Sequence, residues 1–337
     1  MTFQKPFAFS TIVETPVPLI RLVSILSLRR SARSEGDEAL IDSYLMPLNP
    51  DMDNYGNLFV TILDGKEEPA AAFTSHTDSV HFDAPGEDQL TQTLTVSNGN
   101  RMLHLADPDN DDCLGADDGT GIWLMLNMIE AGVPGLYCFF RDEEIGRLGS
   151  EWSIRHEPER YAAIDMMLSF DRKGTQDIIT HQMGARCCSE LFAEQLSAAI
   201  HPECAPDDTG SFTDSYSFMG MIPECTNVCV GYYRQHTGDE CQDLTWAAFL
   251  ANRLIEIDWA GLPVARDPED DEMEIDEHSP TMTELLCFFP EESSDALEAY
   301  MGITAGELLI AIADNERVTP TQLQREIDWG FSERPQI

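Results

Sequence analysis

Short apolar runs alternate with stretches of helical periodicity through the first two thirds of the chain. Apolar residues recur at helical spacing over residues 19–26, and residues 37–46 continue the helical pattern after a Ser/Gly break. Residues 53–57 form a predicted turn, and the branched apolar residues at 58–63 predict the strand that follows it. This alternation predicts an α/β fold of three layers, in which a mostly parallel central sheet lies between helices.

Four later apolar runs are each followed within a few residues by polar side chains. The runs are residues 70–73, 136–140, 166–170 and 228–233, and the polar residues after them are His76, Glu143, Glu144, Asp171 and His236. In an open α/β sheet, ligands bind beyond the carboxyl ends of the strands. The order of these segments therefore predicts that the polar side chains meet in one crevice.

The helical pattern also indicates where the main domain ends. Residues 122–130 carry an apolar stripe closed by Gly132, which places Asp117 in a glycine-flanked loop just before a helix. A second amphipathic stretch at residues 246–257 predicts the last helix of a catalytic domain that spans residues 1–262. The acid-rich residues 263–280 then predict a linker, and residues 281–337 a small C-terminal helical appendage of unknown role.

Composition narrows the range of partners. The 337 residues include 61 acids against 20 lysines and arginines, a formal charge of -41 that repels phosphate backbones and anionic membrane surfaces. We therefore expect no nucleic-acid partner and no membrane partner, and no apolar segment is long enough to span a bilayer. Nine irregularly spaced cysteines and the lack of a secretory leader favour reduced thiols in a cytoplasmic protein. A homo-oligomer remains open.

The polar segments contain the ligand types that a two-metal hydrolase needs, namely histidine and carboxylate on each ion and one shared carboxylate. Asp78 follows His76 by two residues, so it can orient the histidine ring. Asp117 has small neighbours and can be approached from two sides, which makes it the natural bridge. Of the adjacent acids, Glu144 can bind metal while Glu143 accepts and returns a proton.

Together these segments resemble the co-catalytic dizinc exopeptidases, a family of compact bacterial aminopeptidases related to tripeptidases and aminoacylases. The matching stretches are residues 75–78, 115–121, 142–146, 170–171 and 236–240, with the turn at 53–57. The likeness covers residues 15–260. It implies that the chain holds two Zn²⁺ ions, with Co²⁺ or Mn²⁺ as alternatives.

The resemblance also implies a role for each matching residue. His76 and Asp171 would bind one zinc ion, Glu144 and His236 the other, and Asp117 would bridge the two. Glu143 matches the general base and Asp78 the carboxylate that orients His76. The peptide bond between Asp117 and Asp118 is often cis in such proteins.

The spacing of these ligands favours the compact branch of the family. None of the gaps between successive ligands exceeds 65 residues, which leaves no room for an inserted lid domain. Substrate contacts are then expected from local loops such as residues 210–219. The predicted function is a zinc exopeptidase, specifically an aminopeptidase that cleaves short peptides with a water between the zinc ions.

Two other functions stay open at this point. One is an amidohydrolase that removes the acyl group from N-acyl amino acids with the same metal site. The other belongs to a different class, a catalytically silent binding module built on this fold. Complete ligands together with an intact Glu143 weigh against the silent module.

Overall fold

The structure is a computed structural model that describes residues 19–65, 68–82, 90–97, 99, 101–109 and 112–269. The chain divides into two compact units, Met1–Asp271 and Glu272–Ile337. All described residues belong to the first unit. The predicted helical appendage at 281–337 and most of the predicted linker at 263–280 therefore lie outside the described residues.

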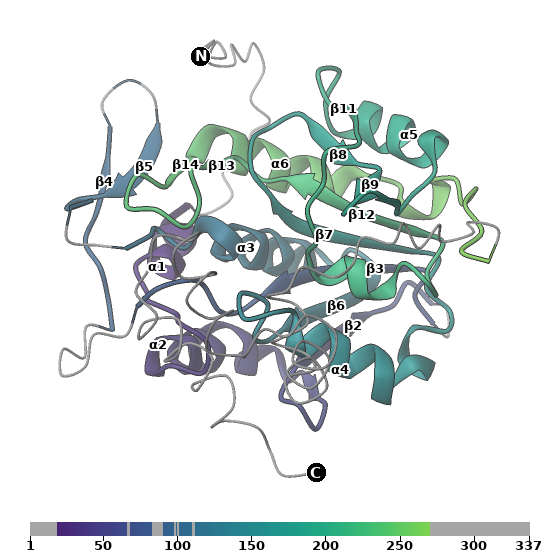
Figure 1. Cartoon of the computed structure of the whole chain (residues 1–337), viewed down its shortest axis with the longest axis horizontal. Coiled ribbons are helices and arrows are strands. Elements are labelled where there is room, and N and C mark those ends of the chain that lie inside the picture. The colour runs from purple at the N-terminus through teal and green to yellow at the C-terminus, as the bar shows by residue number, and fades with distance from the viewer. Residues whose placement is uncertain are drawn as a thin grey trace, which may run out of the picture. The chain divides into compact units, whose positions relative to one another are not determined.

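A mixed sheet of eight strands forms the centre of this unit (Figure 1), in the order β1-β2-β6-β3-β7-β12-β8-β11. Its strands are β1 (Asp51–Met52), β2 (Leu58–Ile62), β3 (Ala71–His76), β6 (Gly135–Phe140), β7 (Met166–Arg172), β8 (Asp177–Ile179), β11 (Ala205–Asp207) and β12 (Glu224–Cys229). The central strands β6, β3, β7 and β12 run parallel, and β8 runs parallel to β11. The other three pairings, β1 with β2, β2 with β6 and β8 with β12, are antiparallel. The predicted mostly parallel sheet is confirmed.

Helices cover both faces of the sheet. They are α1 (Leu19–Leu26), α2 (Glu35–Leu40), α3 (Ala116–Ala131), α4 (Leu148–His156), α5 (Glu190–Ile200) and α6 (Leu244–Glu256), with short turns η1 (Ile41–Leu45), η2 (Met46–Leu48), η3 (Pro158–Tyr161), η4 (Asp214–Phe218) and η5 (Trp259–Gly261). Along β6, Tyr137 and Phe139 join the core under α1, α3, α5 and α6, whereas Leu136 and Cys138 join the core under η3 and η4. This alternation buries both faces of the strand. The predicted three-layer α/β sandwich is confirmed.

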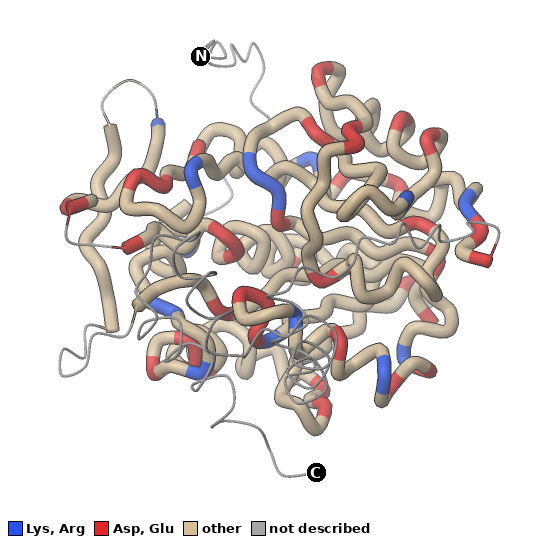
Figure 2. The backbone as a smooth tube through the Cα atoms, in the orientation of Figure 1, with Lys and Arg blue, Asp and Glu red and all other residues tan. Residues whose placement is uncertain are grey.

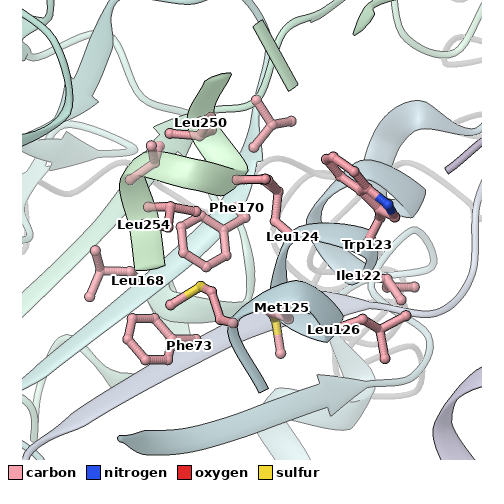
Figure 3. Packing of buried hydrophobic residues seen from close by; sticks show 14 of the residues in the cluster. Phe73, Ile122, Trp123, Leu124, Met125, Leu126, Leu168, Phe170, Leu250 and Leu254 are labelled. Atoms are coloured by element: carbon pink, nitrogen blue, oxygen red, sulfur yellow. The ribbon is translucent and has the colours of Figure 1, made fainter. Parts of the chain in front are cut away.

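The larger core fixes the strands that lead to the polar crevice. Figure 3 shows α3 and α6 packed over β3 and β7, with Phe73 and Phe170 facing Leu250 and Leu254. The rings of Phe73 and Phe170 stack with centroids 5.9 Å apart. All four side chains are fully buried. Their close packing therefore holds β3 and β7 rigidly just before the carboxyl ends of these strands.

A second, smaller antiparallel sheet contains a segment that the sequence assigned to a central strand. Its strands are β4 (Leu94–Val96), β5 (Met102–Leu105), β13 (Tyr232–Tyr233) and β14 (Cys241–Asp243), and a separate hairpin joins β9 (His181–Gln182) to β10 (Ala185–Arg186). Residues 228–233 were predicted as one strand, which is wrong, because β12 ends at Cys229 and β13 belongs to this second sheet. Gly231 makes the break with φ of 95°, where an added Cβ would come within 2.7 Å of Trp246.

Two composition-based expectations concern cysteines and membrane spans. All eight cysteines in the described ranges are free, and all but Cys204 are buried. They pack in the interior, as predicted for reduced thiols. Across the same ranges, no helix combines the length and apolar character needed to cross a bilayer.

Candidate metal centre

The structure brings the five predicted ligands together beyond the carboxyl end of the central sheet. His76 is the last residue of β3, and its Nε2 atom lies 3.2 Å from Asp117 Oδ1 and 3.9 Å from Asp171 Oδ1. The ligand atoms that these three side chains offer all lie within 4.8 Å of one another. They form the first group.

A second group shares Asp117 with the first. His236 Nε2 lies 3.2 Å from Asp117 Oδ2 and 3.1 Å from Glu144 Oε1. These ligand atoms also lie within 4.8 Å of one another. Asp117 thus directs one carboxylate oxygen toward each histidine, which is the arrangement required of a bridging ligand between two cations.

The loop before α3 holds Asp117 in an unusual backbone conformation. The peptide bond between Asp117 and Asp118 is cis, and neither residue has helical dihedral angles although both fall within α3. The carboxylate of Glu240 accepts four backbone N–H bonds from this loop, from Leu114 and Gly115 at Oε2 and from Ala116 and Asp117 at Oε1, at 2.9 to 3.2 Å. Glu240 therefore fixes the backbone that presents the Asp117 carboxylate, which both groups share.

Asp78 links His76 to the two adjacent glutamates. The Nδ1 atom of His76 bonds to the backbone carbonyl of Asp78 at 3.1 Å, with the Asp78 carboxylate 3.5 Å away. The same carboxylate accepts the backbone N–H groups of Glu143 and Glu144 at 3.1 and 3.2 Å. Fully buried Asp78 thus positions both the ring of His76 and the backbone of the two glutamates.

Asp171 is fixed by three side chains from other elements. Tyr232 donates its hydroxyl to Asp171 Oδ1 at 3.0 Å, and Thr213 donates to Oδ2 at 2.7 Å. The amide of Asn227 pairs with the Asp171 backbone, accepting its N–H at 2.9 Å and donating to its carbonyl at 2.7 Å. These bonds leave little rotational freedom to the carboxylate.

His236 differs from His76 in its surroundings. It stands on the loop between β13 and β14 with φ of 62°, and its side chain is 45% exposed. The side chain of His76 is only 1% exposed. The two groups are therefore unequal: one histidine is built into the central sheet, and the other reaches in from a surface loop of the smaller sheet.

The charges in the crevice shift its titrations. Burial alone would lower the pKa of His236, but hydrogen bonds to Asp117 and Glu144 raise it to about 11. Burial, followed by the charge of Asp117, raises the pKa of Glu144 and of Asp171. Burial also raises the pKa of Glu143 well above its usual range, with Glu144 and Asp171 adding to the rise. The histidines act as counter-charges for the buried carboxylates.

Residues of both groups, but not the buried His76, line one cavity of about 320 Å³. The cavity is lined by Asp117, Glu143, Glu144, Gly146, Asp171, Arg172, Lys173, Ser211, Phe212, Tyr232, Gln235 and His236. Ser211 and Phe212 come from the loop that was expected to contact substrate. Arg147 lies over the Phe212 ring at 4.9 Å and over the Tyr216 ring at 4.7 Å, which fixes that loop against the start of α4.

The donor set fits two divalent cations of the zinc type. Each group offers one imidazole nitrogen and carboxylate oxygens, the ligands that zinc accepts, and Asp117 serves both. Four carboxylates, two of them on buried residues and two on partly buried ones, surround one cavity and repel one another unless positive charge is placed between them. Two divalent ions would supply that charge and let both histidines become neutral ligands.

A third group of potential ligands, His81, Asp112 and Cys113, does not offer a comparable site. His81 Nδ1 accepts the backbone N–H of Arg30 at 3.1 Å and also contacts the Ser79 hydroxyl, while Nε2 bonds to Gln92 at 3.3 Å. Both ring nitrogens are already engaged. The bonds identify His81 as a structural histidine.

Sequence reasoning left several supporting residues without a role. Glu240 lies within the matched stretch 236–240, and that position was its only signal. Thr213, Tyr232 and Asn227, which hold Asp171, belong to no recognisable motif. Asp214 falls in the loop at 210–219 that was expected to contact substrate, but nothing in the sequence indicates that it is fully buried.

Three solved structures that share this architecture are peptidases. The aminopeptidase PepT of Bacillus cereus aligns with a TM-score of 0.57 at 14% identity, over 71% of this chain and 97% of that chain. The TET1 peptidase of Pyrococcus horikoshii aligns with a TM-score of 0.55 at 13% identity, over 70% and 98%. A tripeptidase of Staphylococcus aureus aligns with a TM-score of 0.53 at 13% identity, over 71% and 96%. The chain has the fold of these peptidases.

The resemblance seen in the sequence motifs is thus confirmed at the level of the fold. No protein-family model and no curated protein matches the sequence. At 13–14% identity, the structural likeness establishes the architecture. What the crevice does has to be argued from its own residues.

Proposed function

We propose that the chain is a zinc-dependent exopeptidase, specifically an aminopeptidase that cleaves short peptides. One observation carries the proposal: two histidine-and-carboxylate groups share Asp117, and their carboxylates line a single cavity together with Glu143. The aminopeptidase and tripeptidase with the same fold support a peptide substrate. A cavity of about 320 Å³ suits a short peptide.

In this proposal His76 and Asp171 would hold one zinc ion, Glu144 and His236 would hold the other, and Asp117 would be shared by both. Zinc in such a site supplies Lewis acidity, which makes water more acidic and a scissile carbonyl more electrophilic. Asp78 and Glu240 keep the ligand-bearing backbone in place. Co²⁺ or Mn²⁺ would meet the same donors.

Glu143 acts as the general base and then as the general acid. Its side chain is buried in the cavity wall beside the proposed ligands, where a carboxylate can take up and release a proton. The carboxylate takes a proton from the attacking water and returns it to the departing amine. The bond between Glu143 N–H and Asp78 keeps the residue beside the ligands during both transfers.

The proposal also includes the domain boundaries, the cellular location and the oligomeric state. A catalytic domain at residues 1–262 with an appendage at 281–337, and a cytoplasmic location, stay predictions. The TET1 peptidase of Pyrococcus horikoshii can assemble into a tetrahedron or a large octahedral shell. A homo-oligomer is accordingly part of the proposal.

The decisive experiment is Glu143→Gln in protein loaded with two zinc ions. We expect hydrolysis of short peptides to fall by about 10³-fold or more, because the proton acceptor is lost while every ligand stays. Zinc content measured by mass spectrometry should remain two per chain. Exposed Glu194 on α5 provides the control, since Glu194→Gln removes the same charge away from the cavity.

The substrates in that assay separate the related functions. Dipeptides and tripeptides with free amino termini should be cleaved, whereas N-acetylated amino acids should not. Preferential cleavage of the acetylated compounds would replace the aminopeptidase by a deacylase. An unchanged rate in Glu143→Gln at full zinc occupancy would refute the proposed base.

A further inference from the structure

Lys173 is the only lysine in the described part of the chain, and it lines the catalytic cavity. It follows Asp171 by two residues, just beyond the end of β7. The Cys229 thiol donates to the backbone carbonyl of Lys173 at 2.8 Å, and Gly174 N–H donates to the carbonyl of Tyr232 at 2.9 Å. The backbone that carries Lys173 is therefore fixed together with the Asp171 carboxylate.

The two cationic side chains at this edge of the cavity have different surroundings. Arg172 donates to the hydroxyl and carbonyl oxygens of Thr209 at 3.1 and 3.4 Å, and it lies 3.6 Å from Asp177 and 3.7 Å from Asp207. Lys173 is exposed, and its ammonium has no hydrogen bond or ion pair with any residue that the structure describes. Arg172 is thus already neutralised, and Lys173 is available to a ligand.

The charge balance of the loaded cavity makes Lys173 distinctive. Four carboxylates line the cavity, and two divalent cations would offset them. The neutral lining residues are Gly146, Ser211, Phe212, Tyr232 and Gln235. Lys173 then remains as the positive charge without a partner in the cavity wall.

The rest of the molecule opposes the approach of an anion. The chain carries a formal charge of -41, and Figure 2 shows acidic positions distributed over the described trace with far fewer basic ones. A field of this sign repels an anionic group unless a local cation compensates for it. The Lys173 ammonium, carried at the cavity wall by a backbone that is held in place, provides that compensation at one position.

We propose that Lys173 binds a carboxylate of the substrate, so that the site selects short peptides with a free carboxylate close to the scissile bond. The inference rests on the proposed exopeptidase function and names its substrate class. The carboxylate can be the C-terminus of a dipeptide or tripeptide, or the acidic side chain of the N-terminal residue. Both sources present the same group to the ammonium.

Equilibrium binding tests this inference independently of turnover. Isothermal titration calorimetry on zinc-loaded Glu143→Gln protein compares Ala-Ala with Ala-Ala amide, and glutamic acid amide with glutamine amide. We expect the carboxylate member of at least one pair to bind about tenfold more tightly. In the double variant with Lys173→Met that difference should disappear, and Lys173→Arg should retain most of it.

Each pair of compounds identifies one source of the carboxylate. A preference in the first pair assigns the C-terminal carboxylate to Lys173, and a preference in the second assigns an acidic side chain. Arg155→Met, which removes an exposed cation on α4 with a side chain 70% exposed, should leave both preferences unchanged. A preference that survives Lys173→Met, equal affinities within both pairs, or no binding at all would each overturn the inference.

Kinetics on the otherwise wild-type enzyme separates this inference from the proposed function. Lys173→Met should raise KM about tenfold for the member of a pair that carries the free carboxylate, and its kcat should stay nearly unchanged. Both KM and kcat for the neutral amide member should stay nearly unchanged. If no peptide is cleaved by the zinc-loaded wild type, the proposed function fails, while the binding comparison still decides the role of Lys173. An equal loss of kcat for both substrates would assign Lys173 to structure.

Discussion

The backbone N–H of Asp117 donates to the carboxylate of Glu240 across 123 positions of sequence, at 3.2 Å. The same carboxylate accepts three further N–H groups from residues 114–116. Burial and the charge of Asp117 raise the pKa of Glu240 to about 7, while these backbone bonds favour its ionised form. The proposed bridging residue Asp117 thus depends on a second acid, Glu240, that binds the backbone of its loop.

We expect Glu240→Gln to weaken zinc binding without removing a ligand. The glutamine NH₂ group would face two of the four N–H donors, and these donors would lose their acceptor. A chelator competition assay should show zinc affinity reduced about 10- to 100-fold. Asp239→Asn, which changes a neighbouring exposed acid, is the matched control and should bind zinc normally.

The sequence predicted where the candidate site residues of the central sheet lie, because their positions follow from buried strands. β3, β6 and β7 are largely buried, so each leaves a mainly apolar run in the sequence that is followed within a few residues by a polar group. His76, Glu143 and Asp171 could therefore be placed at one sheet edge. Order and burial sufficed for these residues.

The pattern of apolar runs did not predict the features that depend on contacts between distant segments. The apolar run at 228–233 does not reveal that Gly231 turns the chain into a second sheet, so His236 was expected at the end of a central strand. The contact of Glu240 with residues 114–117 leaves no periodic trace in the sequence. Such contacts depend on how two distant loops are packed, and local pattern carries no information about that packing.

Asp78→Asn should reduce turnover more than it reduces metal content. The Asp78 carboxylate accepts the N–H groups of both Glu143 and Glu144, and an asparagine can accept only one of them. We expect kcat to fall about 10- to 100-fold as Glu143 loses its fixed position. Zinc content and kcat measured on the same preparation test this, with exposed Asp64→Asn as the control.

If zinc content falls in proportion to kcat, Asp78 acts only through the ligands. Rescue of kcat by excess zinc would lead to the same conclusion. Either result would contradict a positioning role toward Glu143.

The two histidines should differ in their effect on stability. The His76 ring is buried at the end of β3, so His76→Ala leaves a cavity and removes the partner of Asp78. His236 lies on a surface loop with a half-exposed side chain. In chelator-treated protein we expect His76→Ala to lower Tm by several degrees and His236→Ala to change it by much less.

Zinc titration provides the second measurement for this pair. Both variants should bind one zinc ion fewer than wild type, because each lacks one imidazole ligand. Equal losses of Tm in the two variants would show that the burial of His76 does not stabilise the fold.

Asp214 gives a prediction that involves no proposed ligand. The residue begins η4, is fully buried, and neither carboxylate oxygen has a hydrogen-bond partner of good geometry among the described residues. Burial raises its pKa to about 7, with Asp171 and Asp78 adding to the rise and His76 and Ser150 opposing it. The folded protein therefore holds a proton that the unfolded chain releases near pH 3.9, the ordinary aspartate pKa.

The direction of the pH effect follows from this difference. Between about pH 4 and pH 7 the folded state binds more protons at Asp214 than the unfolded state does, so its contribution to stability is fully present below pH 4 and is lost as the pH rises through 7. Asp214→Asn removes this titration. Relative to wild type, the variant should gain about 2 kcal/mol, or several degrees of Tm, between pH 5 and pH 8.

Thermal unfolding of chelator-treated protein at pH 5, 6, 7 and 8 measures this gain. Because other groups also titrate over the range, the relevant quantity is the difference in Tm between Asp214→Asn and wild type at each pH. Exposed Asp208→Asn changes the net charge equally and should show a constant difference. Parallel Tm curves for Asp214→Asn and wild type would mean that Asp214 is ionised in the folded protein, and that a partner for its charge lies beside it.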